Sequence, residues 1–485
     1  MDADLRSELD RRRVIGAFGA FGAARLFGGP RAFSACGAFS ACGAFGPFGR
    51  TPWRARMDRS DAAQDSSPMA DERARTAAAL RALVGQQSAF ALDLHRELTA
   101  ATPDANAFHS PLSVWTLLAM LHEGARGATR RELAAALRLP STTGTLRLAA
   151  NPMRVGFAAL RDQVAASQHG ATLSFADALW HARSFALNPA AREALRSTFA
   201  AEAGALDFGG APEAAREHIN AWVKEHTGGN IVGLLPSGSV TPLTRLVLTD
   251  AAHFHARWQT PFDVAATHRA PFRRANGSTV NASYMALGEA VSLPVASFDA
   301  AGASRRPWPP GKDGSTWLEL PYAGDGLSFV IAMPDDFQAL AQLERSLDSE
   351  VLAARLAGLT PTRLKLRMPK LALQPRYDLA APLQRLGVKD AFLERAADFA
   401  GFVAPEASEP GSSATVRGLH VTGAFHAAAL RVDEAGTEAS AASGAVVGVR
   451  SLTPFVDIDR PFLFLIRERT SGALLFMGRV TDPAG

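Results

Sequence analysis

The stretch that decides the fold is residues 434–459, EAGTEASAASGAVVGVRSLTPFVDID. It contains no proline from Glu434 through Ser451, and alanine, serine and glycine cannot hold a helix against a core, so the segment reads as an exposed loop. Alternate residues from Thr437 to Val447 are small and uncharged, and the only charge, Glu438, falls on the other face of an extended chain. We therefore expect a loop that becomes a buried strand in a second state, with a flexible linker as the alternative.

The regions around this stretch mix helices and strands. Helical periodicity and start signals predict helices at 76–100, 129–139 and 212–227, and another that begins at Ser110-Pro111. Strand-like runs lie at 244–249, 317–320, 327–333, 363–368, 427–432, 461–468 and 474–480, with loops at 299–315 and 404–417. Helices come first and strands later, which favours an α+β fold over alternating βαβ units.

Composition excludes several classes of protein. The chain has 485 residues, 47% of them hydrophobic, with 51 Lys+Arg against 47 Asp+Glu. Residues 76–485 carry 39 basic and 38 acidic residues without a basic cluster, so we expect no nucleic-acid partner. No apolar run approaches the roughly 18–20 residues of a membrane-spanning helix, so we expect no membrane partner and a soluble body.

The first 75 residues differ from the rest. They contain both cysteines and a Gly/Ala/Phe-rich repeat, which leaves residues 76–485 without disulfides, thiolate metal sites or a cysteine nucleophile. Arg11-Arg12-Arg13 before an apolar run is similar to an export signal, but Arg25 and Arg31 interrupt that run. We predict a low-complexity, disordered leader at 1–75, either an export signal or spurious upstream sequence, and one domain at 76–485.

Signatures of enzyme chemistry are missing from the sequence. It contains no G-x-S-x-G, HExxH or Walker A motif. His253 and His255 share one face of a strand, but a metal site would need further ligands nearby. We therefore expect a protein that is not an enzyme and that needs no cofactor or metal.

A series of motifs in register resembles the serpin family of serine protease inhibitors, from about Thr76 to Pro483. The motifs are Asn106-x-x-x-Ser110-Pro111-Leu112-Ser113, Gly124-Ala125-Arg126-Gly127, Ile219-Asn220-x-Trp222-Val223, Trp258-x-x-Pro261-Phe262, Leu320-Pro321-Tyr322, Met368-Pro369-Lys370, Arg460-Pro461-Phe462-Leu463-Phe464 and Phe476-Met477-Gly478-Arg479-Val480. Each is weak alone, and their order makes the series specific. The high alanine and arginine content is typical of a bacterial member.

The resemblance implies a metastable α+β fold with a large central mixed β-sheet, two further sheets, surrounding helices and an exposed reactive-centre loop. The family's spacing from Glu434 places the reactive bond at Arg450–Ser451, and an arginine there implies trypsin-like targets. Such a protease would be trapped as a covalent 1:1 acyl-enzyme when loop 434–450 inserts into the central sheet. The alternative is a non-inhibitory serpin-fold binding or chaperone protein.

The resemblance also implies three groups of supporting residues. The hinge of the loop comprises Glu434, Gly436, Thr437, Ala439 and Ala441, and the breach, where insertion begins, comprises Trp258, Lys370 and Glu434. The shutter, where strands must part, comprises Ser110, Ser113, Asp250 and His426, and many serpins have asparagine in place of Asp250. Because an anion beside His426 favours its protonated form, we expect sheet opening to depend on pH.

Partners and compartment follow from the same resemblance. In the helix at 129–139, Arg130, Arg131 and Arg138 are offset by Glu132, so we expect no heparin dependence. We expect a monomer that acts outside the cell or in the periplasm, with the cytoplasm as the alternative.

Overall fold

The computed structural model describes residues 68–140, 152–299, 301–305, 314–403, 418–437 and 453–484. Every element below belongs to the unit Asp65–Gly485. Among the helices described, none combines the length and the apolar character that a membrane crossing requires.

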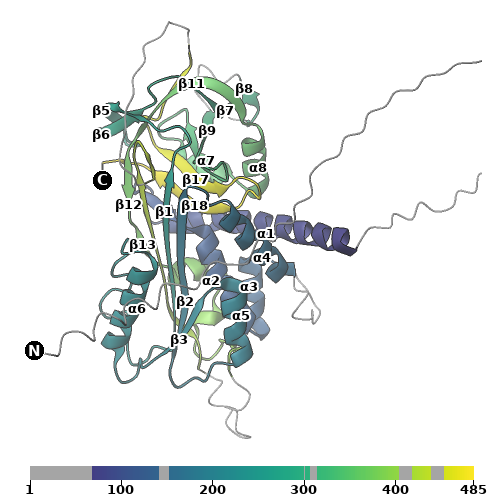
Figure 1. Ribbon diagram of the computed structural model, residues 1–485. Helices are drawn as coiled ribbons and strands as arrows, with labels where there is room; N and C mark the ends of the chain where they lie inside the picture. Colours follow the sequence, from purple (N-terminus) through teal and green to yellow (C-terminus); the bar gives the residue numbers. More distant parts are fainter. Residues whose placement is uncertain are drawn as a thin grey trace, which may run out of the picture. The chain divides into compact units, whose positions relative to one another are not determined.

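Most of the longer helices begin with a proline, whose fixed φ suits the first helical turn. The helices are α1 (Pro68–Thr99), α2 (Pro111–Gly124), α3 (Gly127–Ala136), α4 (Pro152–Ala166), α5 (Pro189–Phe199), α6 (Pro212–His226), α7 (Leu340–Ser346), α8 (Ser349–Ala357), α9 (Ala380–Arg385) and the 3₁₀-helix η2 (Asp390–Phe392) (Figure 1). Ser110 caps α2, because its side chain accepts a hydrogen bond from the backbone N–H of Ser113.

A seven-stranded central sheet carries the site described below. Its main order is β12 (Leu371–Leu373), β14 (Val421–Val432), β4 (Leu246–Arg257), β2 (Ala171–Ala182) and β3 (Glu202–Leu206). Strand β13 (Arg376–Asp378) also pairs with β14, and β15 (Gly436–Thr437) pairs with β4. The sheet is mixed, because β14 runs parallel to β4 while β2 and β15 run antiparallel to it.

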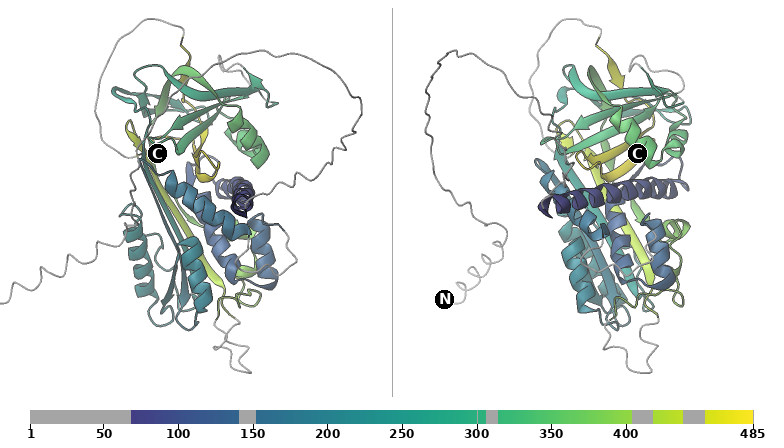
Figure 2. Two further views of the ribbon diagram at one scale, coloured as in Figure 1. Left: turned by 45° about the vertical axis from the view of Figure 1, so that its right-hand side comes forward. Right: turned by 90° about the vertical axis from the view of Figure 1, so that its right-hand side faces the viewer.

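Side chains alternate between the two faces of the central sheet. On β4, Leu248, Ala252 and Phe254 join the larger core, which includes α2, α4 and α5, whereas Val247 and Ala251 join a second core with α6. Figure 2 shows α6 on one side of the long strands and the helices of the larger core, α2, α4 and α5, on the opposite side. The period-2 pattern of β4 therefore fixes which of its residues face α2.

The remaining strands form a second hydrogen-bonded system with β11 at its junction. The strands are β1 (Ala107–His109), β5 (Asp263–Arg273), β6 (Thr279–Ala286), β7 (Val291–Asp299), β8 (Ser304–Arg305), β9 (Gly314–Pro321), β10 (Leu327–Pro334), β11 (Thr360–Pro369), β16 (Phe455–Asp457), β17 (Phe462–Glu468) and β18 (Leu474–Val480). The first half of β11 pairs with β7 and its last residues pair with β6, so one strand serves two sheets. This arrangement agrees with the predicted α+β fold of a central mixed sheet and two further sheets.

Several predicted boundaries are wrong in ways that tertiary pairing explains. Strand β4 continues to Arg257 rather than ending at residue 249, and β14 begins at Val421 rather than at residue 427. Both extensions contain Ala and His residues of modest β propensity, which the neighbouring strands hold in the sheet. Helix α1 begins at Pro68, inside the predicted leader, and the predicted loop at 404–417 lies outside the described residues.

Candidate functional site

The site begins where β14 separates from β4. Their last paired residues are Ala429 and His253, and beyond this point β4 pairs with β15 instead. Gly436 and Thr437 lie antiparallel to Arg257 and Ala256, while β2 pairs with the other edge of β4. Strand β15 therefore occupies the first two positions of an additional strand beside β4.

Gly436 is required for this pairing by close approach. A Cβ atom at Gly436 would lie 2.0 Å from the carbonyl oxygen of Ala256 and 2.6 Å from Cα of Arg257, both of them backbone atoms. No side chain fits in that space without moving β4. Only glycine allows the chain to enter the sheet here.

A tight turn connects β14 to β15. Asp433 Oδ1 accepts hydrogen bonds from the backbone N–H groups of Ala435 at 3.0 Å and Gly436 at 3.3 Å. The backbone N–H of Asp433 donates in turn to the carbonyl of Gly436 at 2.8 Å. This side-chain cap holds the reversal that points β15 back along β4.

Trp258 donates hydrogen bonds to the turn from both its side chain and its backbone. The indole Nε1 donates to the carbonyl of Asp433 at 2.9 Å, and the backbone N–H of Trp258 donates to the carbonyl of Ala435 at 3.0 Å. The ring stacks on Tyr322 with a centroid separation of 4.7 Å. Trp258 thus ties the turn to the end of β4.

Glu434 is a buried carboxylate held by two donors. Lys370 Nζ lies 2.7 Å from its Oε2, and Thr267 Oγ1 donates to its Oε1 at 2.5 Å. Burial alone would raise the pKa of Glu434, but the hydrogen bonds from Lys370 and Thr267 outweigh it, and the pKa is lowered. The structure brings Trp258, Lys370 and Glu434 together around one turn. Thr267 was not anticipated, because nothing in its local sequence distinguishes it.

The second cluster crosses the central sheet beneath α2. Pairing places Asp250 directly between His426 on β14 and Asp177 on β2. Ser113 Oγ contacts Asp250 Oδ1 and lies 2.7 Å from Asp177 Oδ1. Ser110 donates from its hydroxyl to the carbonyl of Leu475 at 2.8 Å, which links the cluster to β18.

His426 accepts one hydrogen bond and contacts one carboxylate. Its Nε2 accepts a hydrogen bond from the backbone N–H of Ser110 at 3.1 Å, and its Nδ1 lies 3.2 Å from Asp250 Oδ2. Because Nε2 acts as an acceptor, the ring proton belongs on Nδ1, facing Asp250. The pH dependence of sheet opening stays a prediction, and this geometry gives it a location.

Asp177 is the member of this cluster that the sequence analysis missed, because β2 was not predicted as a strand. Burial raises the pKa of Asp177 well above its usual range, and the charge of Asp250 raises it further. The hydrogen bond with Ser113 opposes that rise. The cluster therefore contains two carboxyl groups in contact with a single serine hydroxyl.

The remaining predicted site residues lie outside the described residues. They are Ala439, Ala441, Arg450 and Ser451. The description resumes at Thr453, and β16 pairs in parallel with β11, where Arg367 Nε donates to Asp457 at 2.8 Å. The segment that contains them is thus anchored by β15 on the central sheet and by β16 on another.

A central mixed sheet with a short entering strand and a long connecting segment defines the class of protein. The family model described as Serpin (serine protease inhibitor) matches residues 85–483. The chain belongs to the serpin family.

Relatives and solved structures agree with this assignment. Leukocyte elastase inhibitor from Bos taurus is 35% identical over 405 residues, which cover 81% of this chain and 97% of the relative. Plasminogen activator inhibitor 1 from Bos taurus is 31% identical over 397 residues, which cover 81% and 91%. The crystal structure of native protease nexin-1 with heparin is similar with a TM-score of 0.70 and 26% identity, covering 83% of this chain and all of that chain. Two of these relatives are thus named as inhibitors.

Proposed function

We propose that this serpin inhibits trypsin-like serine proteases as a suicide substrate that is cleaved at Arg450–Ser451. The observation that supports the proposal is the pairing of β15 with β4 at the point where β14 separates. That pairing is the start of a strand whose remainder would come from the small, uncharged residues after Thr437. The protein supplies no catalytic residue, because the protease supplies them all.

The chemical step belongs to the protease. Its serine Oγ attacks the carbonyl carbon of Arg450, the bond to the nitrogen of Ser451 breaks, and the released amine takes the proton. An ester then joins Arg450 to the protease. Insertion of the loop would carry the attached enzyme away from its reactive geometry before water can hydrolyse the ester.

Insertion requires the central sheet to open along β14 and β4. Their parallel pairing from Val421 to Ala429 must break, and the incoming strand, antiparallel to both neighbours, would make backbone hydrogen bonds on each edge. The pairs to be separated include His426 with Asp250. We therefore assign the Ser110, Ser113, Asp250 and His426 cluster to control of strand separation, and the Trp258, Lys370 and Glu434 cluster to its start.

Target specificity rests on the residue at the cleaved bond. An arginine side chain matches a protease pocket with a carboxylate at its base, because a guanidinium pairs with a carboxylate in two parallel hydrogen bonds. The names of the relatives specify elastase and plasminogen activator as the targets of those proteins, so targets differ within the family. Arg450 is the argument for a trypsin-like target here.

We also propose that inhibition requires no heparin and that the protein acts as a monomer. Arg138 pairs with Asp93, and Arg130 donates to the carbonyl of His122, so two of the three arginines near α3 are engaged within the fold. Glu132 accepts hydrogen bonds from the backbone at Lys389 and Asp390. We retain an extracellular or periplasmic location as a prediction, with the cytoplasm as the alternative. We also propose that the domain begins upstream of residue 76, because helix α1 begins at Pro68.

The test mixes the full chain with trypsin and separates the products by denaturing electrophoresis. We expect an SDS-stable band near the summed masses and a released peptide whose N-terminus is Ser451. Arg450→Ala should remove both, whereas Arg305→Ala, at an arginine outside the loop, should leave both unchanged. Absence of cleavage at Arg450 in the unmodified chain would refute the assignment.

The same experiment distinguishes inhibition from the non-inhibitory alternative. A related structure is described as human thyroxine-binding globulin complexed with thyroxine, at 27% identity and a TM-score of 0.69, so binding proteins occur among the neighbours. Clean cleavage at Arg450 without a stable band would favour that alternative. The absence of bulky or charged residues at Thr437, Ala439 and Ala441 argues for inhibition.

A further inference from the structure

A buried pair of histidines joins α1 to β1. His95 Nδ1 lies 3.1 Å from His109 Nε2, and the two side chains are 1% and 0% exposed. On its other side, His95 Nε2 lies 3.0 Å from Glu344 Oε1 on α7. Neither histidine belongs to the two clusters described above, so the proposed insertion gives the pair no role.

The hydrogen bonds of the pair determine where its protons lie. A carboxylate only accepts, so His95 Nε2 carries a proton toward Glu344. In the uncharged pair, His95 Nδ1 therefore accepts and His109 Nε2 donates to it. His109 Nδ1 is then left without a proton, and it has no hydrogen-bond partner among the described residues. The uncharged pair thus has one proton in the gap between the rings and none where an acceptor is missing.

Added protons do not fit this arrangement. If the gap keeps its single proton, one added proton becomes a buried N–H on His109 Nδ1 without an acceptor, which is unfavourable. A second added proton would place two N–H groups in the 3.1 Å gap, and two donors cannot bond to each other. The contact between α1 and β1 would then be lost.

The surroundings of His109 oppose its protonation. Burial lowers the pKa of His109 well below its usual value, and the charges of His95 and His426 lower it further. His426 in turn faces Asp250 on β4, so the carboxylate of that strand is directed toward His426.

The other titratable groups around the pair do not supply a free counter-charge. Burial would raise the pKa of Glu344, but the hydrogen bonds and charges of His95 and Arg479 outweigh it, and the pKa is lowered. Arg479 Nη1 on β18 lies 3.2 Å from Glu344 Oε2 and shares its charge. On the side of β13, burial raises the pKa of Tyr377 to about 12, so its hydroxyl stays neutral and accepts from the backbone N–H of Phe108 at 3.3 Å.

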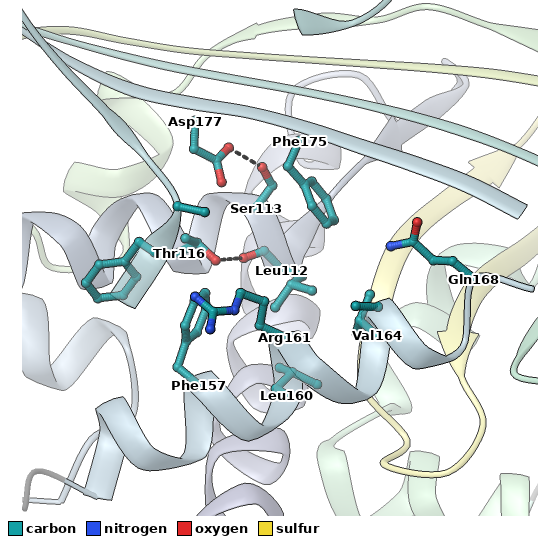
Figure 3. Close-up of a pocket in the computed structure, with 13 residues that line it drawn as sticks. Leu112, Ser113, Thr116, Phe157, Leu160, Arg161, Val164, Gln168, Phe175 and Asp177 are labelled. Atoms are coloured by element: carbon teal, nitrogen blue, oxygen red, sulfur yellow. Dashed lines mark hydrogen bonds between the residues drawn. The ribbon is translucent and has the colours of Figure 1, made fainter. Parts of the chain in front are cut away.

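The pair adjoins the row of side chains that crosses the central sheet. His109 is the last residue of β1, a strand of three residues that pairs with β18. The next residue, Ser110, caps α2 and donates its backbone N–H to His426 Nε2 at 3.1 Å. One turn later, Ser113 bonds to Asp177 of β2, as Figure 3 shows. A displacement of β1 would therefore reach both β14 and β2 through the start of α2.

We propose that the His95–His109 pair is an acid-sensitive link that keeps the central sheet closed, and that its protonation favours separation of β14 from β4 without a protease. Once the contact between the rings is broken, each ring can bind water and take a proton. Because the closed pair excludes added protons and the open one accepts them, a fall in pH shifts the equilibrium toward the open sheet. The link acts on the same sheet opening that the proposed function requires, and it is separate from protonation of His426 beside Asp250.

The test measures hydrogen–deuterium exchange of the β14 and β4 backbone amides in the full chain at pH 7.5 and pH 5, corrected for the intrinsic pH dependence of exchange. We expect opening to increase about tenfold at pH 5, within the roughly thirtyfold that one histidine with an ordinary pKa near 6.5 can supply over this range. His109→Phe keeps a buried ring without a titratable group and should remove most of that increase. At pH 7.5 its exchange should stay close to that of the unmodified chain.

Three further variants keep the proposal falsifiable. His95→Gln removes the other ring and should have the same effect, also if His109→Phe does not fold. His169→Phe, at an exposed histidine, should behave like the unmodified chain. Asp250→Asn removes the carboxylate beside His426 and should retain an acid-induced increase.

Three results would overturn the proposal. They are an increase that survives both His109→Phe and His95→Gln, an increase that disappears only in Asp250→Asn, and the absence of any increase at pH 5. Exchange is measured without a protease, so a failure of the inhibition test would leave this result unaffected, and the reverse also holds.

Discussion

At the scale of single residues, Glu434 shows how a buried charge holds the entering strand in place. Its lowered pKa means that its contribution to stability is present at neutral pH and is lost as the pH falls through the lowered value. Lys370→Ala should cost about 1 kcal/mol at pH 7, a modest loss because the lysine is one-third exposed and solvent screens the pair. The loss should shrink at acid pH, where the carboxyl is protonated.

Urea unfolding at pH 7 and pH 3 measures this effect. Lys365→Ala, at an exposed lysine on β11, is the matched control and should change little at either pH. Equal destabilisation by Lys370→Ala at both pH values would show that the ion pair with Glu434 is not its cause.

His122, near the end of α2, makes a separate prediction about acid stability. Burial is the main cause that lowers its pKa to about 4, and the charge of Arg130 adds to it, while Glu123 acts in the opposite direction and Arg126 in the same one. As the pH falls below about 6.5, the unfolded chain binds a proton that the folded chain does not bind until about 4. Folding therefore loses stability across this window, by about 3 kcal/mol from His122.

Substitution isolates that contribution. His122→Leu places an apolar side chain of similar size in the buried position. It should reduce the loss of unfolding free energy between pH 7 and pH 4 by about 3 kcal/mol. His169→Leu, at an exposed histidine, should leave the slope unchanged. The interpretation is wrong if the unfolding free energy of His122→Leu falls with pH as steeply as that of the unmodified chain.

At the scale of elements, the pairing of β15 with β4 predicts which substitutions would prevent the proposed inhibition while leaving cleavage intact. Thr437 pairs with Ala256 as the second residue of the entering strand. The alternation of the loop places Thr437 on the face that would be buried and Glu438 on the opposite face. Thr437→Arg would require a buried, unpaired charge on insertion, which costs several kcal/mol.

The expected result is cleavage at Arg450 by trypsin with loss of the SDS-stable complex. Glu438→Arg introduces the same side chain one residue later on the exposed face and should retain the complex. Densitometry of the complex and cleaved bands gives the partition for each variant. A stable complex with Thr437→Arg would contradict the proposed insertion.

The elements also show what the sequence can and cannot predict. The order of motifs, the mixed character of the central sheet and the grouping of Trp258, Lys370 and Glu434 followed from the sequence and from the resemblance. Strand β2 and the length of β4 did not, because their alanine-rich, polar segments become strands only when neighbours pair with them. Asp177 was missed for this reason. Its significance depends on lying opposite Asp250, a contact that no local pattern encodes.

At the scale of the whole molecule, one residue links helix α2 to two strands of the central sheet. Ser113 contacts both Asp177 on β2 and Asp250 on β4. Asp250 in turn lies opposite His426 on β14, across the pairing that the proposed insertion must break. The proposed opening of the sheet therefore separates a row of side chains that α2 holds from one side, so the helix and the strands must rearrange together.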